Sequence, residues 1–141
     1  MNLAKFLLVA AVAGGGAHLW QAHEHSVVRR QLSAAADSNG FVPILTSGDE
    51  MADTAVILAA LNCPSAQAKR ADAMARQLTQ MGIPNRRANN YSLSRVTRDQ
   101  MPLMSQTNAV LTGEIPIVII NGMAKANPTA DEVAAEYRRG R

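Results

Sequence analysis

The sequence has little cysteine and few aromatic residues. Cys63 is the single cysteine among 141 residues, which excludes an intramolecular disulfide framework and a structural zinc site built from several thiolates. Aromatic residues account for only 4% of the chain, so the core must consist mostly of Ala, Val, Ile, Leu and the seven methionines. Because alanine buries little apolar area, we expect modest stability.

Charged residues are also sparse and nearly balanced in sign. They make up 18% of the chain, and 14 basic against 11 acidic residues leave a net charge of +3. The basic residues are scattered, whereas a nucleic-acid-binding domain usually gathers them on one face, so we expect no nucleic-acid partner. His18, His23 and His25 lie close together in the sequence, but a metal site needs a rigid ligand arrangement. We interpret them as solvated and expect no metal.

The first twenty residues have the layout of a targeting segment. Lys5 supplies a positive charge, residues 6–13 form an apolar run, and small residues follow with an Ala-x-Ala match, as in a secretory signal peptide. The alternative is an uncleaved membrane anchor helix over residues 3–20, although three glycines weaken a span that needs about 20 apolar residues. We therefore expect a signal peptide or anchor over residues 1–20, and an extracytoplasmic protein that is periplasmic, secreted or anchored to the inner membrane.

Residues 21–40 are polar and weakly periodic, which is typical of a linker, and one domain is expected over residues 41–141. Residues 55–61 form a continuous apolar run and predict a strand buried on both faces. In residues 65–81, apolar side chains recur every three or four positions and predict a helix. Pro64 suits the first position of this helix, and Gly82 suits its C-terminal cap. A polar strand is expected to follow around residues 84–89.

The second half of the domain predicts a helix, a hairpin and a final helix. The Asn-Gly pair at 121–122 is a hairpin-turn signal, and Thr129-x-x-Glu132 is a capping box at the start of a helix. Pro43 confines a further strand over residues 41–45 to a sheet edge. The remaining expected elements are a helix over residues 99–108 and strands over 115–120 and 123–126. The resulting order, β-α-β-α-β-β-α after the edge strand, predicts an α/β fold.

Cys63 falls between the first buried strand and the helix that follows it. The unpaired N–H groups at a helix N-terminus carry partial positive charge, which favours a thiolate over a thiol. Cys63 is therefore a candidate nucleophile. The alternative is that it serves as a small buried apolar residue.

Several segments resemble glutaredoxins and other thioredoxin-fold proteins. The Val-Ile-Leu of residues 56–58 and the Asn-Cys-Pro-Ser-Ala of residues 62–66 resemble their first strand and active-site helix. The Met-Gly-Ile-Pro of residues 81–84 is similar to the end of that helix, and residues 113–122 resemble their cis-proline segment. The resemblance spans roughly residues 55–137. It implies a thioredoxin-like three-layer sandwich, in which a central mixed sheet is flanked by helices.

The resemblance also implies a site. Pro116 would be cis and lie beside Cys63, the reactive thiol. Pro64, Ile115, Pro116 and Thr129 would contact the bound thiol or peptide, with the helix that starts at Thr129 receiving a carboxylate; simple helix capping is the alternative role for Thr129.

The chain departs from this family in two respects. Ala66 stands where dithiol members have a second cysteine, so a dithiol cycle within one chain is excluded. The Gly-Gly pair with which glutaredoxins approach glutathione is not evident in residues 123–128. Arg86 and Arg87 offer cations for glutathione carboxylates, but adjacent arginines in a polar segment are usually solvated. Glutathione is therefore weakly supported, and no cofactor is expected.

Two functions stay open. The first is monothiol–disulfide exchange through Cys63, with a protein or a low-molecular-weight thiol as partner. The second is a thioredoxin-fold binding or scaffold module without catalysis, which the absent second thiol favours.

Overall fold

A computed structural model describes residues 26–46, 53–93 and 96–141. The expected signal peptide or anchor at residues 1–20 lies outside these ranges. Residues 26–35, in the expected linker, are helical. In the parts of the chain that the structure describes, no helix is long and apolar enough to cross a membrane. Residues 1–34 and 35–141 form two compact units, and the sheet lies in the second.

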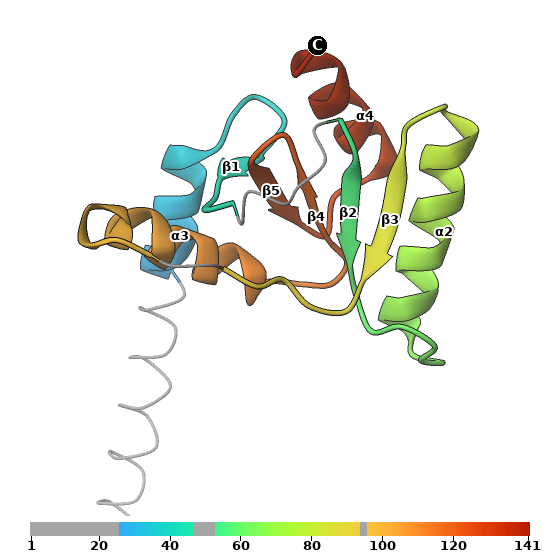
Figure 1. The fold of residues 1–141 in the computed structure, drawn as a ribbon, viewed down its shortest axis with the longest axis horizontal. Helices are drawn as coiled ribbons and strands as arrows, with labels where there is room; N and C mark the ends of the chain where they lie inside the picture. The colour runs from blue at the N-terminus through green and yellow to red at the C-terminus, as the bar shows by residue number, and fades with distance from the viewer. Residues whose placement is uncertain (1–25, 47–52, 94–95) are drawn as a thin grey trace, which may run out of the picture. The chain divides into compact units, whose positions relative to one another are not determined.

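The second unit is built on one mixed sheet of five strands in the order β1-β5-β4-β2-β3 (Figure 1). Strands β2 and β3 are parallel, and every other neighbouring pair is antiparallel. The expectation of an α/β fold with a mixed sheet is therefore confirmed. The strands are β1 (Val42–Pro43), β2 (Ala55–Leu58), β3 (Asn85–Ala88), β4 (Ile117–Ile120) and β5 (Met123–Ala126).

Helices cover the sheet. Helix α2 (Ala66–Gln80) packs on β2 and β3 and contacts α4 (Ala130–Arg139), which packs on β4. Helix α3 (Met101–Leu111) continues a short 3-10 helix, η1 (Arg98–Gln100), and contacts β1 and β5. In Figure 1, α3 and α2 lie on opposite sides of the strands. The arrangement is compatible with three layers.

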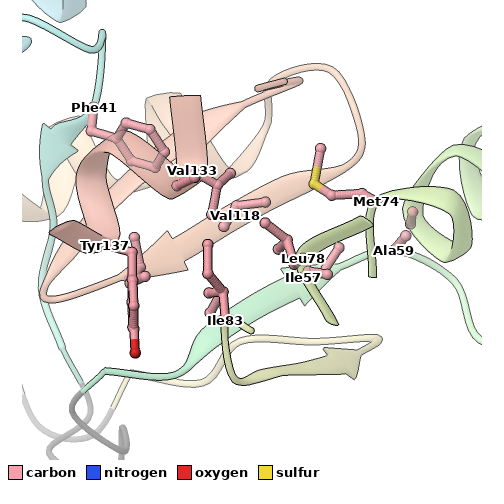
Figure 2. Close-up of a cluster of buried hydrophobic side chains, with 13 residues drawn as sticks. Phe41, Ile57, Ala59, Met74, Leu78, Ile83, Val118, Val133 and Tyr137 are labelled. Carbon is pink, nitrogen blue, oxygen red and sulfur yellow. The ribbon is translucent and has the colours of Figure 1, made fainter. Parts of the chain in front are cut away.

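The main core lies between the sheet and the layer of α2 and α4. All four residues of β2 and of β4 are buried, as expected for central strands covered on both faces. Successive side chains of a strand alternate between faces, so Ile57 and Val118 point toward the helices. Figure 2 shows these two side chains gathered with Leu78 of α2 and Val133 of α4. Leu78 and Val133 are fully buried.

Two turns confirm their sequence signals. Asn121 and Gly122 both have positive φ, 52° and 73°, as the two central residues of a type I′ hairpin turn require. After α2, Gly82 has φ 72°, and the Ile83 N–H donates to the Leu78 carbonyl at 2.9 Å. This is the Schellman arrangement that glycine permits at the end of a helix.

The beginning and end of several elements differ from the prediction. Strand β2 ends at Leu58, before residue 61, and Asn62 adopts φ 53°. Helix α2 begins at Ala66 with Ser65 as its N-cap, so the placement of Pro64 at the first helical position is wrong. The extended Ser65 backbone lets its hydroxyl accept the Ala68 N–H at 3.2 Å. This cap places the first helical residue at Ala66, two positions after Pro64.

The other differences are local. Strand β4 starts at Ile117, because Pro116 has no N–H to donate to a neighbouring strand. Helix α3 continues three residues past Asn108, to Leu111. Pro102 lies in its first turn as expected, where the missing N–H costs no helical hydrogen bond.

A cluster of charges joins the turn before β1 to α4. The Asp37 carboxylate accepts the Phe41 N–H at 2.8 Å and pairs with Arg139 at 3.0 Å. Arg139 also donates to Glu136 at 2.9 Å, a carboxylate that is only 1% exposed. Residues 37–41, partly in the expected linker, are thereby held against the C-terminal helix.

Replacing Leu78 by alanine tests the core. The Leu78 side chain is 0% exposed, and Leu→Ala changes at such positions cost about 2–5 kcal/mol of stability, because apolar burial is lost and a cavity remains. We expect this loss in urea denaturation of the full-length protein. Met101→Ala is the control, because Met101 is 56% exposed and a surface change costs about 0.5 kcal/mol or less. Equal midpoints for the two variants would contradict the core assignment.

Candidate thiol site

Cys63 lies in the loop between β2 and α2, two residues before the N-cap of the helix. Its thiol is free and partly exposed, so it is not sealed in the core as the small-apolar-residue alternative requires. Pro64 beside it is exposed. Strand β2 is buried on both faces, and the start of α2 is fixed by its cap. The loop between them therefore places the sulfur beyond the C-terminal end of β2.

The N-cap serine acts on the sulfur. A hydrogen bond from the Ser65 side chain, and then one from the Ser65 backbone N–H, lower the pKa of Cys63 below its ordinary value, while slight desolvation opposes them. The Ser65 hydroxyl accepts from the Ala68 N–H, and a hydroxyl can donate its own proton at the same time. The Ser65 hydroxyl thus connects the first turn of α2 to the Cys63 sulfur.

The Ile115–Pro116 peptide bond is cis, as the resemblance implies. Pro116 is fully buried, and its carbonyl accepts the Asn127 N–H at 2.7 Å. Ile115 is 37% exposed, and its backbone N–H donates to no residue that the structure describes. Within the described part of the chain, this N–H beside the cis-proline thus has no acceptor.

Arg70 of α2 connects the helix to the cis-proline segment. Its guanidinium donates through Nη2 to the Ile115 carbonyl at 2.9 Å and through Nη1 to the Glu114 carboxylate at 3.1 Å. The helix that begins beside Cys63 is thus hydrogen-bonded to the residue that precedes Pro116. The sequence did not indicate this role for Arg70, because its partners lie more than forty positions away along the chain.

Arg87 holds the other side of the Cys63 loop. It forms an ion pair with Asp72 of α2 and donates to the Ala60 carbonyl at 3.1 Å. Its guanidinium is therefore engaged within the protein and is not free for a glutathione carboxylate. Arg86, its neighbour on β3, is exposed.

Thr129 caps a helix. Its hydroxyl accepts the Glu132 N–H at 3.2 Å, and its own N–H donates to the Glu132 carboxylate at 2.8 Å. The capping box expected from the sequence is confirmed, and both bonds lie in the first turn of α4. One donor that a ligand carboxylate could use at this residue, the Thr129 N–H, is thus occupied by the helix's own glutamate.

A cavity of about 260 Å³ opens where β2 and β3 end. Residues from four segments line it: the end of β2 and the start of the Cys63 loop, the loop after β3, the end of α3, and the segment around Pro116. No pattern in the sequence indicates this cavity, because only the sheet register brings these segments together. Its lining is Leu58, Ala59, Ala60, Asn89, Asn90, Tyr91, Leu111, Ile115 and Ile117.

Within the described ranges, no group of three or more His, Cys, Asp or Glu side chains is placed to hold a metal ion. No family model matches the chain. No curated protein and no solved structure matches it at a significant level either.

Ser65→Ala tests the origin of the lowered pKa of Cys63. Only the thiolate is alkylated by iodoacetamide, so the alkylation rate rises with pH through the pKa of the thiol. In wild type we expect this rise at lower pH than for an ordinary thiol, and Ser65→Ala should move it to higher pH because both the hydroxyl donor and the helix cap are lost. Ser65→Thr should restore it.

The control for Ser65→Ala is Thr129→Ala, which removes the matching cap of α4. Each loss of a cap costs about 0.5–2 kcal/mol of stability, but only the Ser65 change should shift the pH profile. Identical profiles for all variants would show that Ser65 does not act on the sulfur.

Proposed function

We propose that this chain is an extracytoplasmic glutaredoxin- or thioredoxin-like protein that performs monothiol–disulfide exchange through Cys63. The single observation that carries the proposal is the partly exposed thiol of lowered pKa at the start of α2, together with the hydrogen bond from α2 to the residue before a cis-proline. A lowered pKa increases the thiolate fraction, and the thiolate is the nucleophile in disulfide exchange.

The topology supports the thioredoxin-like part of the proposal. The central strands run in the order β3-β2-β4-β5, with β2 and β3 parallel and β4 and β5 antiparallel to their neighbours. Cys63 follows β2, and the cis-proline precedes β4. The mixed sheet, the cysteine after a central strand and the cis-proline before another strand agree with what the resemblance to glutaredoxins implies.

The exchange has two balanced steps. The Cys63 thiolate attacks one sulfur of a disulfide R–S–S–R′, so that the Cys63–S–R bond forms and R′–S⁻ leaves. A second thiolate then attacks the sulfur that carries R in this mixed disulfide, so that a new S–S bond to R forms, the bond to Cys63 breaks, and Cys63 leaves as the thiolate. The second thiol must come from outside the chain, because Ala66 occupies the position of a resolving cysteine. The mixed disulfide therefore persists until an external thiol arrives.

The extracytoplasmic location in this proposal rests on the N-terminal layout. The positive residue, apolar run and small residues of the first twenty positions favour export, and an anchored form would contact the membrane through residues 3–20. Disulfide exchange suits such compartments, which are generally more oxidising than the cytoplasm.

A binding module without turnover is the second candidate function. One observation favours it: the chain has no second thiol, so a catalytic cycle cannot be completed within one molecule. In this case the same face recognises a partner, and Cys63 contributes no covalent step.

Cys63→Ser separates the two functions. The full-length protein is mixed with a disulfide that releases a coloured thiolate, and an excess of a low-molecular-weight thiol is added. Exchange predicts release of many equivalents of thiolate per protein above the background rate, and Cys63→Ser should remove this excess entirely. A single equivalent, or equal rates for wild type and variant, would favour the binding module.

Arg70→Met tests the connection between α2 and the cis-proline segment. Loss of a hydrogen bond worth about 1 kcal/mol should slow exchange with the disulfide reporter about fivefold, because the Ile115 segment is no longer held. Alkylation of Cys63 by iodoacetamide should not change, since this small reagent does not need the segment. Arg76→Met, which changes an exposed arginine of the same helix, is the control and should leave both rates unchanged. A loss in both assays would assign Arg70 a merely structural role.

A further inference from the structure

The cavity beside the cis-proline has the size of one large side chain. Small-molecule pockets usually span about 300–1,000 Å³, and this cavity, at about 260 Å³, is smaller. Apolar cavities of about 150 Å³ already hold a benzene ring. Its lining includes aliphatic side chains from β2, α3 and β4, namely Leu58, Leu111 and Ile117. An apolar group of the size of leucine or phenylalanine fits such a space.

Among the described residues of the lining, the Tyr91 phenol is the only ionisable acid or base, and the Tyr91 hydroxyl donates to the Leu45 carbonyl at 2.8 Å. Glu114, the charged residue next to Ile115 in the sequence, forms an ion pair with Arg70. A carboxylate that enters this space would lose water and would find no cation among the described lining residues, which is costly. The cavity therefore favours an uncharged occupant.

The rim of the cavity offers groups that match a peptide backbone. Asn89 and Asn90 are exposed and line it, and each side-chain amide can both donate and accept hydrogen bonds, as a peptide unit does. The Ile115 N–H is a further donor without a partner among the described residues.

The cavity lies within reach of the thiol. Ala60 lines it, and Cys63 is three residues further along, so their Cα atoms are at most about 11 Å apart. An extended peptide spans that distance in about three residues. A peptide whose cysteine is bonded to Cys63 can thus place a neighbouring side chain in the cavity.

We propose that this cavity receives one large apolar side chain of a protein substrate, two or three residues from the cysteine that exchanges with Cys63. The substrate is then a cysteine-containing protein segment with an adjacent leucine-like or aromatic residue, rather than glutathione, whose carboxylates find no cation among the described lining residues. This inference rests on the proposed function and specifies its substrate class.

Short peptides test the proposal. Each is acetylated, amidated and linked through its cysteine sulfur to thionitrobenzoate. Attack of the Cys63 thiolate on the peptide sulfur forms the mixed disulfide and releases thionitrobenzoate, which is coloured. The peptides carry leucine, alanine or aspartate two or three residues from the cysteine on either side, and the glutathione–thionitrobenzoate disulfide is compared with them. With the full-length protein, the best leucine peptide should react about tenfold faster than its alanine counterpart, as expected from burial of the side chain. The aspartate peptide and glutathione should show no such gain.

Two variants locate the effect. Ile115→Asp and Leu111→Asn each place a polar group in the lining from a different segment, and neither side chain is fully buried, so both should fold. Each should reduce the preference for leucine over alanine to about twofold or less. Met101→Asp introduces the same charge at another exposed apolar residue and should retain the full preference.

The outcomes separate this proposal from the one on which it rests. Release at equal rates from leucine, alanine and glutathione reagents, or fastest release from glutathione, overturns the cavity assignment while the exchange function stands. A preference that survives both lining variants also overturns it. No release above that of Cys63→Ser with any reagent refutes the exchange function itself.

Discussion

The register between β2 and β4 is the constraint on which the rest of the site depends. These central antiparallel strands pair Leu58 with Ile117. The chain therefore leaves β2 and enters β4 at the same end of the two strands. The segment after β2 carries Cys63, and the segment before β4 carries the cis Ile115–Pro116 bond. A shift of one residue would turn every side chain of a strand to the opposite face, and burial on both faces makes such a shift costly in either strand. The packing of the core thus determines which loops become neighbours.

Two arginines then hold these loops in place. Arg70 crosses from α2 to the Ile115 carbonyl, and Arg87 crosses from β3 to the Ala60 carbonyl. Both bonds satisfy backbone carbonyls that lie outside the strands, where the sheet no longer supplies partners. Guanidinium groups suit this task because they present several donors in a fixed plane. These two hydrogen bonds and the Ser65 cap restrict the conformation of the loop segments, which are otherwise held only by the strands and the helix at their ends.

Much of the fold could be predicted, because its signals are local. The apolar runs of β2 and β4, the spacing of apolar residues in α2, the Asn-Gly turn and the Thr129 capping box each depend on a few neighbouring residues. The site was less predictable. Position along the chain indicated Cys63, and only a family resemblance indicated Pro116. Other parts of the site depend on partners distant in sequence, namely Arg70, Arg87 and the cavity wall at Leu111. The start of α2 is mispredicted for a different reason: proline favours a first helical turn, which suggests Pro64, but the Ser65 side chain caps the helix and starts it later.

The buried Glu136 has a practical consequence for handling this protein. Its counter-charge, Arg139, is the third residue from the C-terminal end of the chain, and the same guanidinium reaches Asp37 near the beginning of the sheet-containing unit. Removing the last three residues would leave the buried Glu136 carboxylate without its ion-pair partner, which is costly. It would also remove the ion pair that holds Asp37, and with it the segment leading into β1. A tag appended after Arg141 leaves this contact intact. The last turn of α4 therefore marks the limit to which the gene can be trimmed.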